Sequence, residues 1–488
     1  MRKARIKTDV LNKLPLAVDL DGSLVCCDLF VESLLRVFFS KPWKVPLVAV
    51  WLLKGRAYAK ARLAKDFPPD PADLPYDGRL LDWLRAERAG GRTLVLATAS
   101  DQYAARLVAD HLGLFDRVFA SNGQVNLKSA QKADLLAAAF PDGFVYAGNA
   151  AADMAVWRRA DAAVLINLSG DLLRRAEDTF EVERKFAPIG NTASSLIKAI
   201  RPQQWAKNVL VFLPMLVGQA WSNLAAWEGA LGAFWALCFT ASSVYLLNDA
   251  ADIDADRRHL HKRFRPFASG ALSPAVGLSV GVVLVGLGFA LGTVVHVVAL
   301  LCIYLAATTL YSFWLKRVVL VDVFLLAGLY TIRVVIGGVT SGIVVSDWLM
   351  AFCCFFFLSL ALAKRVAEVD ALEARGGGVL SRRGYFGSDG TILRMMGVGA
   401  GFVAALVLAL YLQDSSNAAR YREPFLLWVL PAVVLFWLCR LWLMADRGEM
   451  QEDPLVFAFG DKTSWAAALF IAAAFAAAVL MPWGLRPW

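Results

Sequence analysis

Three aspartates near the middle of the chain offer the clearest chemistry. Asp249, Asp252 and Asp256 are spaced at i, i+3 and i+7, so a helix would place their carboxylates on one face. Long apolar runs flank them on both sides. Carboxylates gathered at a membrane surface repel each other unless a cation lies among them. Mg²⁺ bridging a diphosphate is the natural candidate, because it binds one or two carboxylates together with substrate phosphate oxygens.

A basic cluster follows the aspartates directly. It includes Lys262 and Arg265, which we expect to bind the remaining phosphate charge. The alternative is a solvated loop of mixed charge between two apolar segments. Several acidic residues at helical spacing beside a bilayer favour the functional interpretation.

A second set of reactive side chains lies in the first 180 residues, where polar residues follow short apolar segments. The short apolar run 14–20 ends in two acids at i and i+2, Asp19 and Asp21. The hydroxyls of Thr98 and Ser100 follow the run 93–97, the amide of Asn149 and the acid of Asp153 follow 144–147, and Lys132 lies in an amphipathic stretch. Buried strands that end in such residues place them together at the carboxyl edge of a parallel sheet.

The overall composition is that of a polytopic membrane protein with room for a second domain. Of 488 residues, 58% are apolar, and mean hydropathy is positive, which excludes an ordinary soluble enzyme. The formal charge is +9, and the lysines and arginines lie near the ends of apolar runs. This placement indicates that they orient membrane segments and bind phosphate, and it does not favour nucleic-acid binding. The seven cysteines show no metal-ligand spacing. The basic N-terminus leads into no cleavable apolar core, so no signal peptide is expected.

Residues 191–206 read as a linker and an amphipathic helix that leads into the membrane domain, residues 207–488. Nine apolar segments follow, which we interpret as nine transmembrane helices: 207–220, 226–248, 274–294, 296–314, 319–339, 346–364, 391–412, 423–443 and 463–482. The shorter apolar core 45–53 is flanked by Lys41, Lys44, Lys54 and Arg56. Nine residues are short for a span, so it fits a helical cap of the first domain, which we prefer, or a helix on the bilayer surface.

Loop charges predict the topology. The loops that carry most of the lysines and arginines alternate with loops that have almost none, so the positive-inside rule places the basic loops in the cytoplasm. The aspartate cluster and the first domain then face the cytoplasm of a bacterial-type inner membrane.

A second charged stretch begins within the sixth expected span and carries Lys364, Arg365 and Glu368. Its expected depth in the membrane matches that of the aspartate cluster, which indicates one shared site. The alternative is that these are charged side chains at a helix end that extend to the membrane surface without binding a substrate. Arg333 lies inside the fifth span, where an arginine normally faces a polar interior. Arg201 and Lys207 could bind phosphate, or they could only set the orientation of the first span in the membrane.

The order Asp-x-Asp, hydroxyl, lysine and Asn/Asp at strand ends resembles the haloacid dehalogenase phosphohydrolase superfamily over residues 1–190. The resemblance implies an α/β Rossmann-like parallel sheet with a helical cap. It also implies roles for the residues of the second set: Asp19 as nucleophile, Asp21 as general acid/base, Thr98 or Ser100 on the phosphoryl group, Lys132 as charge partner, and Asn149 and Asp153 with Asp19 at Mg²⁺. Asn149 stands where the family usually has aspartate, so a scaffold that binds phosphate or braces the membrane domain stays open beside a phosphatase.

The pattern Asn-Asp-x-x-Asp-x-x-x-Asp in a nine-helix protein resembles the UbiA superfamily of intramembrane prenyltransferases. The resemblance implies that Asp249, Asp252 and Asp256 hold Mg²⁺ and diphosphate with support from Asn248. Tyr311 and Lys316 resemble the family's Tyr/Lys element on the next cytoplasmic loop. Lys364 and Arg365 stand where typical members carry a second acidic pair.

Four further motifs resemble the decaprenyl-phosphate phosphoribosyltransferases: Arg-Pro-x-Gln-Trp-x-Lys-Asn at 201–208, Asp-Arg-x-His at 256–259, Lys-Arg-x-Arg-Pro at 262–266 and Ala-Lys-Arg-x-Ala-Glu at 363–368. That subgroup implies phosphoribosyl pyrophosphate as donor and a polyprenyl phosphate as acceptor. Lys262, Arg265, Lys364 and Arg365 would hold the phosphates that Mg²⁺ does not.

The sequence therefore predicts a phosphatase-like head fused to an all-α membrane transferase, with Mg²⁺ as cofactor. Two alternatives remain: an aromatic or quinone-precursor prenyltransferase that uses prenyl diphosphate, and a lipid transporter with a regulatory head. A transporter would show inverted repeats or matching broken spans, and no convincing repeat is present. The sequence leaves a homo-oligomer open.

Overall fold

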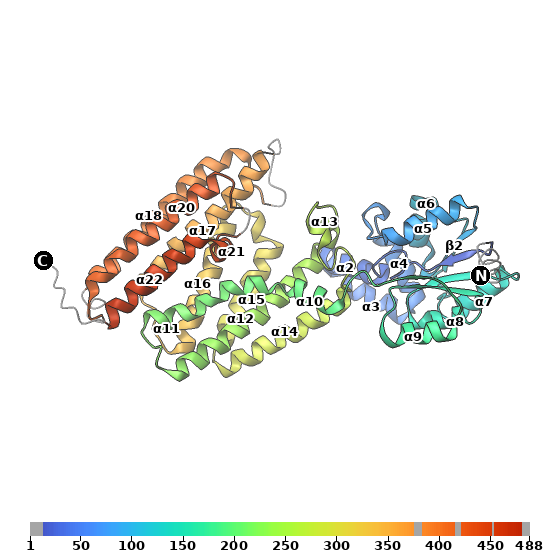
Figure 1. Cartoon of the computed structure of the whole chain (residues 1–488), viewed down its shortest axis with the longest axis horizontal. Helices are drawn as coiled ribbons and strands as arrows, with labels where there is room; N and C mark the ends of the chain where they lie inside the picture. The colour runs from blue at the N-terminus through green and yellow to red at the C-terminus, as the bar shows by residue number, and fades with distance from the viewer. Residues whose placement is uncertain (1–12, 375–382, 415–420, 451–452, 481–488) are drawn as a thin grey trace, which may run out of the picture. The chain divides into compact units, whose positions relative to one another are not determined.

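The structure, a computed structural model, describes residues 13–374, 383–414, 421–450 and 453–480. The chain forms two compact units (Figure 1). The first, here the head unit, runs to Ile200 and also includes Tyr245–Val280; the second, here the helical unit, comprises Arg201–Val244 and the chain from Gly281 onward. The aspartate cluster therefore belongs to the same compact unit as the first domain.

The head unit contains a six-stranded sheet with the order β3-β2-β1-β4-β5-β6, and every pairing in it is parallel. The strands are short and, in the centre, buried on both faces, which is why they appear in the sequence as continuous apolar runs. Their bounds are β1 (Leu16–Val18), β2 (Leu94–Asp101), β3 (Arg117–Ser121), β4 (Val145–Gly148), β5 (Ala162–Ile166) and β6 (Val182–Phe186). This confirms the predicted parallel α/β domain.

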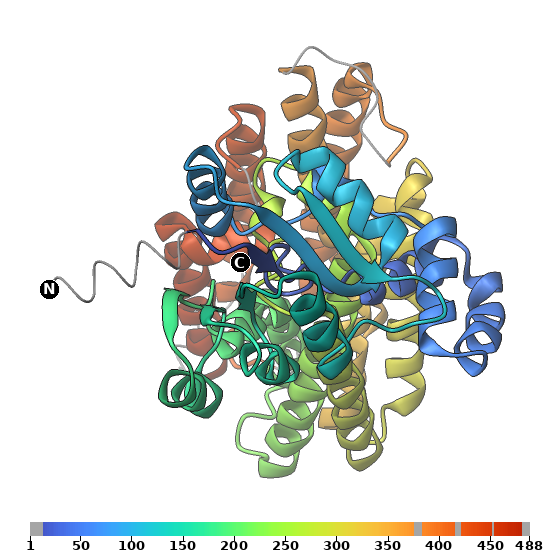
Figure 2. The ribbon, with the colours of Figure 1, turned by 90° about the vertical axis from the view of Figure 1, so that its right-hand side faces the viewer.

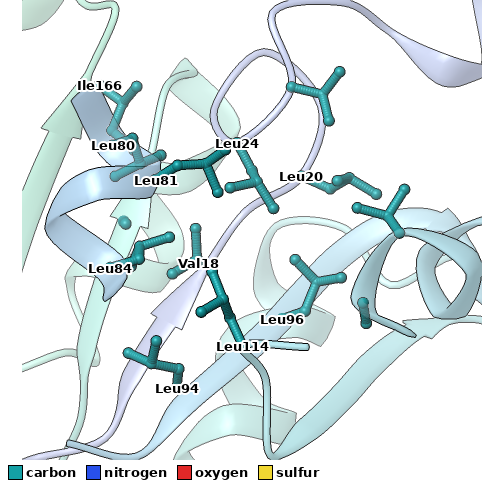
Figure 3. Close-up of a cluster of buried hydrophobic side chains, with 14 of the residues drawn as sticks. Val18, Leu20, Leu24, Leu80, Leu81, Leu84, Leu94, Leu96, Leu114 and Ile166 are labelled. Carbon is teal, nitrogen blue, oxygen red and sulfur yellow. The ribbon is translucent and has the colours of Figure 1, made fainter. Parts of the chain in front are cut away.

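Two apolar layers cover the faces of the sheet. On one face, Val18 and Leu96 pack with Leu80 and Leu84 of α5 (Gly78–Ala89) and with α6 (Gln102–Leu112) (Figures 2 and 3). The opposite face packs against α7 (Ala130–Ala139), α8 (Met154–Trp157) and α9 (Gly170–Thr179). Successive strand residues point to opposite faces, so both layers must be filled for the sheet to be buried.

A small helical layer is inserted between β1 and β2. It consists of α2 (Leu29–Ser40), the 3₁₀ helix η1 (Pro42–Lys44), α3 (Val45–Leu53) and α4 (Arg56–Asp66). Its own core joins Val37 of α2, Val48 and Trp51 of α3, and Leu63 of α4. The segment 45–53 is thus one short helix of this layer, as the preferred interpretation expected.

Seven described helices are long and apolar enough to cross a membrane. Their ranges are Leu224–Ala251 (α12), Pro274–Val294 (α14), Val321–Ser341 (α16), Asp347–Glu373 (α17), Gly387–Gln413 (containing α18, Gly390–Gln413), Pro424–Asp446 (containing α20, Val429–Asp446) and Lys462–Leu480 (α22). The protein is therefore a multi-pass membrane protein with seven candidate spans.

Two of the nine expected spans differ from the prediction. The fourth is α15 (Val298–Phe313), which has 16 residues. The first, 207–220, is replaced by the 3₁₀ helix η4 (Pro202–Phe212) and the five-residue α11 (Leu213–Val217). Pro214 at the start of α11 lacks a backbone N–H, which explains why one regular helix does not run through this segment.

The expected single helix through the aspartate cluster is interrupted. The helix α12 ends at Ala251, Asp252 adopts a non-helical conformation (φ −101°, ψ 8°), and a second helix, α13, spans Ile253–Arg257. The one-face argument from ideal helical spacing therefore does not hold beyond Asp252. Asp249 lies on the first helix and Asp256 on the second.

Trp157 provides a test of the head's packing. It is 2% exposed, and its indole N–H donates to the Tyr146 carbonyl at 3.0 Å. Trp157→Ala is expected to lower the free energy of unfolding of the head by about 3–5 kcal/mol, because it leaves a cavity and an unpaired carbonyl. Hydrogen exchange at β4 and β5 should accelerate accordingly. Tyr103→Ala, at an exposed site, is the control, and equal protection in both variants would contradict the packing described.

Candidate functional site

The sheet's carboxyl edge gathers the predicted head residues. Asp19 follows β1 and accepts a hydrogen bond from Lys132 Nζ on α7 at 2.7 Å. The same ammonium group donates to the Tyr146 hydroxyl at 2.8 Å, and that hydroxyl donates to Asp153 at 2.9 Å. Burial raises the pKa of Asp19 to about 6, although Lys132 opposes the shift. A carboxylate beside a lysine is compatible with the predicted role of Asp19 as a nucleophile that forms an aspartyl phosphate.

Asp21 lies two residues on and is held from two directions. Its carboxylate accepts hydrogen bonds from the Leu29 backbone N–H at 3.0 Å and from the Ser100 hydroxyl. Thr98, on the same strand, accepts from the Ser100 backbone N–H at 3.0 Å, so its hydroxyl oxygen supports the turn. Burial, with Asp28 adding to it, raises the pKa of Asp21 to about 7. That value suits a general acid/base at neutral pH.

Gly22 makes the close approach of two strand ends feasible. Its φ is +73°, and a Cβ placed there would lie 2.1 Å from the Asn149 side-chain nitrogen. No side chain fits. The Asn167 amide donates to the Gly22 carbonyl at 2.9 Å. The missing side chain at Gly22 therefore lets Asn149 lie beside the Asp19–Asp21 turn.

The donor atoms at this edge are compatible with Mg²⁺, which prefers carboxylate and amide oxygens. Asp19 and Asn149 can supply them. Asp153 accepts from the backbone N–H groups of Asn149 and Ala150 at 3.0 and 2.9 Å, in addition to Tyr146. These three bonds use three of the roughly four acceptor positions of an ionised carboxylate, so Asp153 could also ligate the metal as predicted.

The aspartate cluster is organised by one arginine. Arg265 Nη1 lies 2.8 Å from Asp256 Oδ2 and 3.2 Å from Asp249 Oδ1. Both aspartates are buried, whereas Asn248 and Asp252 are half-buried and Lys262 is exposed. Burial raises the pKa of Asp256, and Arg265 opposes the shift. Two carboxylates from different helices thus converge on a single cationic position.

A convergent carboxylate pair fits Mg²⁺, since this ion commonly uses one or two carboxylates and completes its shell with water and substrate phosphate. Among the residues the structure describes, no group of three or more His, Cys, Asp or Glu side chains is arranged to hold a metal ion. Asp249 and Asp256, with Asp252 between them in sequence, are the residues that would hold it.

Ion pairs join this cluster to the helical layer of the head. Arg257 donates to both oxygens of Glu32 on α2, at 2.9 and 2.5 Å, and both side chains are 4% exposed. Arg36 on α2 binds Asp254 through two bonds of 2.9 Å. Because Leu29 at the start of α2 donates to Asp21, one helix contacts both Asp21 and the aspartate segment.

The helical unit contains a buried carboxylate that the sequence analysis did not assign. Asp453 binds Lys207 at 2.7 Å, Lys364 at 3.2 Å and the Tyr330 hydroxyl at 3.0 Å. Burial opposes ionisation of Asp453, but Lys364 and Lys207 outweigh it and hold the pKa of its carboxyl below the usual range. Lys207 and Lys364, two predicted phosphate ligands from distant segments of the chain, thus bind the same carboxylate.

Arg365 lies in a different environment from its neighbour Lys364. Its side chain is fully buried and pairs with Asp322 at 2.5 Å and with Glu368. Arg383 binds Glu368 at 3.3 Å and the Tyr311 hydroxyl at 3.1 Å. Arg365, Glu368 and Tyr311 therefore belong to one ion-pair network.

Two other predicted residues lie in short segments of the helical unit. Lys316 is half-buried in the 3₁₀ helix η6 (Leu315–Arg317), and Arg201 precedes η4 with φ +54°. The mid-span Arg333 does face a polar interior, as expected. It donates to Asn208 at 2.9 Å and to the Tyr304 hydroxyl at 3.0 Å.

Asp453, Asp322 and Arg383 were missed by sequence reasoning. Asp453 carried a usable signal: it precedes Pro454, and an Asp-Pro step is typical of an N-cap followed by the first helical residue. It does cap α21 (Pro454–Gly460), accepting from the Leu455 N–H at 3.3 Å. Asp322 lies in a span with only apolar neighbours in sequence, and nothing local identifies Arg365 as its partner.

Comparison with known proteins gives a family match in the C-terminal part. The model of the UbiA prenyltransferase family matches residues 211–461. The uncharacterized protein y4nM of Sinorhizobium fredii is 37% identical over 98% of this chain and 95% of its own length. A decaprenyl-phosphate phosphoribosyltransferase of Corynebacterium glutamicum is 35% identical over 50% of this chain and 75% of its own length.

Solved structures resemble each part. A UbiA homolog from Archaeoglobus fulgidus bound to GPP and Mg²⁺ covers 58% of this chain and 98% of its own, with 15% identity and a TM-score of 0.46. A substrate-bound phosphoserine phosphatase covers 36% of this chain and 92% of its own, with 14% identity and a TM-score of 0.26.

The buried Arg257–Glu32 pair gives a testable consequence. Arg257→Gln leaves Glu32 buried without its counter-charge, so it is expected to lower the local stability of the aspartate segment and α2 by about 3–5 kcal/mol. Hydrogen exchange in α2 and α13 measures this. Arg175→Gln, which breaks the exposed pair with Asp171, is the matched control and should change stability by less than about 1 kcal/mol. Unchanged exchange in α2 would contradict a stabilising role for the pair.

Proposed function

Because the chain belongs to the UbiA prenyltransferase family, we propose that it transfers 5-phosphoribose from phosphoribosyl pyrophosphate to a polyprenyl phosphate. Residues 207–488 would form the transferase domain, residues 191–206 the linker, and residues 1–190 the phosphatase-like domain. The convergence of Asp249 and Asp256 on one cationic position is the observation that carries the proposal. The similarity to a decaprenyl-phosphate phosphoribosyltransferase supports this choice of substrates.

The charges agree with a donor rich in phosphate. Bound Mg²⁺ would supply charge neutralisation for the leaving diphosphate, and Asp249, Asp252 and Asp256 would hold it. Arg265 contacts two of these carboxylates, so it is suited to turn toward a diphosphate that shares their position. The exposed Lys262, together with the Lys207–Lys364 pair, is suited to bind the donor and acceptor phosphates that Mg²⁺ does not hold. Asn248, Lys316 and Arg201 are the other predicted contacts.

Asp453 supports a role of the lysine pair in anion binding. Lys207 and Lys364 already hold one carboxylate between them, and a phosphate presents the same charge and acceptor chemistry. Lys364 keeps 29% of its side chain exposed, whereas Arg365 has none. The accessible lysine is therefore the better phosphate ligand of the two, and Arg365 supports the fold through Asp322.

The head would then remove the 5-phosphate from the lipid-linked product. Asp19 would attack phosphorus while Lys132 offsets negative charge, and Asp21 would give a proton to the departing sugar oxygen. Asp21 would then take a proton from the water that hydrolyses the aspartyl phosphate and releases phosphate. The ion pairs between α2 and the aspartate segment support this coupling, since they hold both candidate sites within one unit. The family's prenyl transfer to an aromatic acceptor is the competing reaction, and the choice of donor separates them.

The first test offers purified protein with Mg²⁺ either labelled phosphoribosyl pyrophosphate and a polyprenyl phosphate or, separately, labelled prenyl diphosphate and an aromatic acceptor. Label should enter the organic phase from phosphoribosyl pyrophosphate only. Asp249→Asn and Asp252→Asn are each expected to lower the rate at least about 100-fold, because each removes charge from the metal site. Asp19→Asn should leave transfer intact and stop phosphate release from the lipid product. Full turnover by both cluster variants would refute the transferase assignment.

The second test separates the neighbours Lys364 and Arg365. Lys364→Gln is expected to raise KM for the donor at least about tenfold with folding retained, since a charge-assisted phosphate contact is lost. Arg365→Gln should instead destabilise the protein by about 3–5 kcal/mol, because Asp322 is left buried without its partner. Steady-state kinetics and thermal unfolding measure the two effects. Reversed outcomes would exchange the roles of the two residues.

A further inference from the structure

The helix α3 presents an apolar surface that its own domain does not cover. Only Val48 and Trp51, at i and i+3, are buried against the helical layer. The other apolar side chains from η1 to the end of α3 are exposed, most strongly Trp43 at 71% and Leu53 at 88%. Leu47 and Val50 are 43% and 47% exposed. A contiguous apolar surface of this kind marks an interaction site.

Positive charge surrounds this surface. Residues 41–65 contain seven lysines and arginines and no acidic residue. Lys41, Lys54 and Arg56 are exposed at the two ends of the apolar stretch, while Lys44 lies 3.8 Å from Asp66. Exposed aromatic and aliphatic side chains between basic ends are typical of helices that lie in the headgroup region of an anionic bilayer.

The contacts of α2 place this surface close to the end of a candidate span. A cavity of about 40 Å³ is lined on one side by Phe39 and Ser40 of α2 and on the other by Ala250 and Ala251. Ala251 is the last residue of α12. Only four residues separate Ser40 from Val45, so α3 begins no more than about 18 Å from Ser40 even if the connection were extended.

We propose that α3 is an interfacial anchor that docks the head onto the anionic surface of the membrane its own spans cross. Trp43, Leu47, Val50 and Leu53 enter the boundary between headgroups and acyl chains, and Lys41, Lys54 and Arg56 contact lipid phosphates. This anchoring is independent of any catalytic activity. A head held in this way has its cap at the depth where the phosphate of a membrane lipid is found.

The test uses the full-length protein, one copy per nanodisc, with a fluorescent nitrobenzoxadiazole label at Leu53→Cys. The control label is at Arg85→Cys on α5, where the arginine side chain is 60% exposed. Unsubstituted protein labelled in parallel corrects for the exposed native cysteines, Cys302, Cys354 and Cys439. The nanodiscs contain phosphatidylcholine alone or mixed with phosphatidylglycerol, each with a phosphatidylcholine carrying a shallow spin-label quencher.

In anionic nanodiscs, quenching at Leu53→Cys should exceed that at Arg85→Cys at least about threefold, because an interfacial side chain lies at the quencher's depth. Adding Lys54→Gln and Arg56→Gln should reduce this quenching at least about twofold in anionic nanodiscs and leave it unchanged in phosphatidylcholine alone, because the lost attraction is electrostatic. Equal quenching at the two labels would overturn the proposal. The proposal would also be overturned if the Leu53→Cys label were unquenched in nanodiscs but became shielded in detergent as the protein concentration rises. That result would assign the apolar surface to contact with a second copy of the chain.

Discussion

Buried like charges require a shared counter-charge, and this constraint governs the aspartate segment. Asp249 and Asp256 come from two helices and meet at Arg265. Without a cation between them, the two carboxylates would have to separate or bind protons. The segment is therefore built around a position that must be positive. In the proposed reaction Mg²⁺ would supply this positive charge and bind the donor's diphosphate.

The same rule operates at the other polar clusters. Lys132 lies between Asp19 and Asp153 in the head, and Asp453 lies between Lys207 and Lys364 in the helical unit. In each case a central charge is flanked by two of opposite sign. Such triads cost less to bury than single charges, and they leave one flanking group able to exchange its partner for a substrate.

Much of the architecture follows from the sequence because its determinants are local. Continuous apolar runs ending in polar residues predict the parallel sheet, and this prediction is confirmed. The structure brings Asp21 and Ser100 together at its carboxyl edge. The UbiA resemblance is confirmed by the family match. Helical spacing alone does not reveal the break at Asp252, because that depends on how the chain turns toward Arg265. The pairs Arg257–Glu32 and Arg365–Asp322 join residues far apart in sequence, and no local pattern specifies them.

The salt bridge between Glu32 and Arg257 has a consequence for how such a fused chain can change over generations. Neither residue can be replaced alone without leaving a desolvated charge, so the two positions are expected to be inherited together. Exchanging the head for that of another protein would require the incoming helix to bring its own acid to this place. The fusion is thus maintained by chemistry as well as by the peptide bond that links its parts.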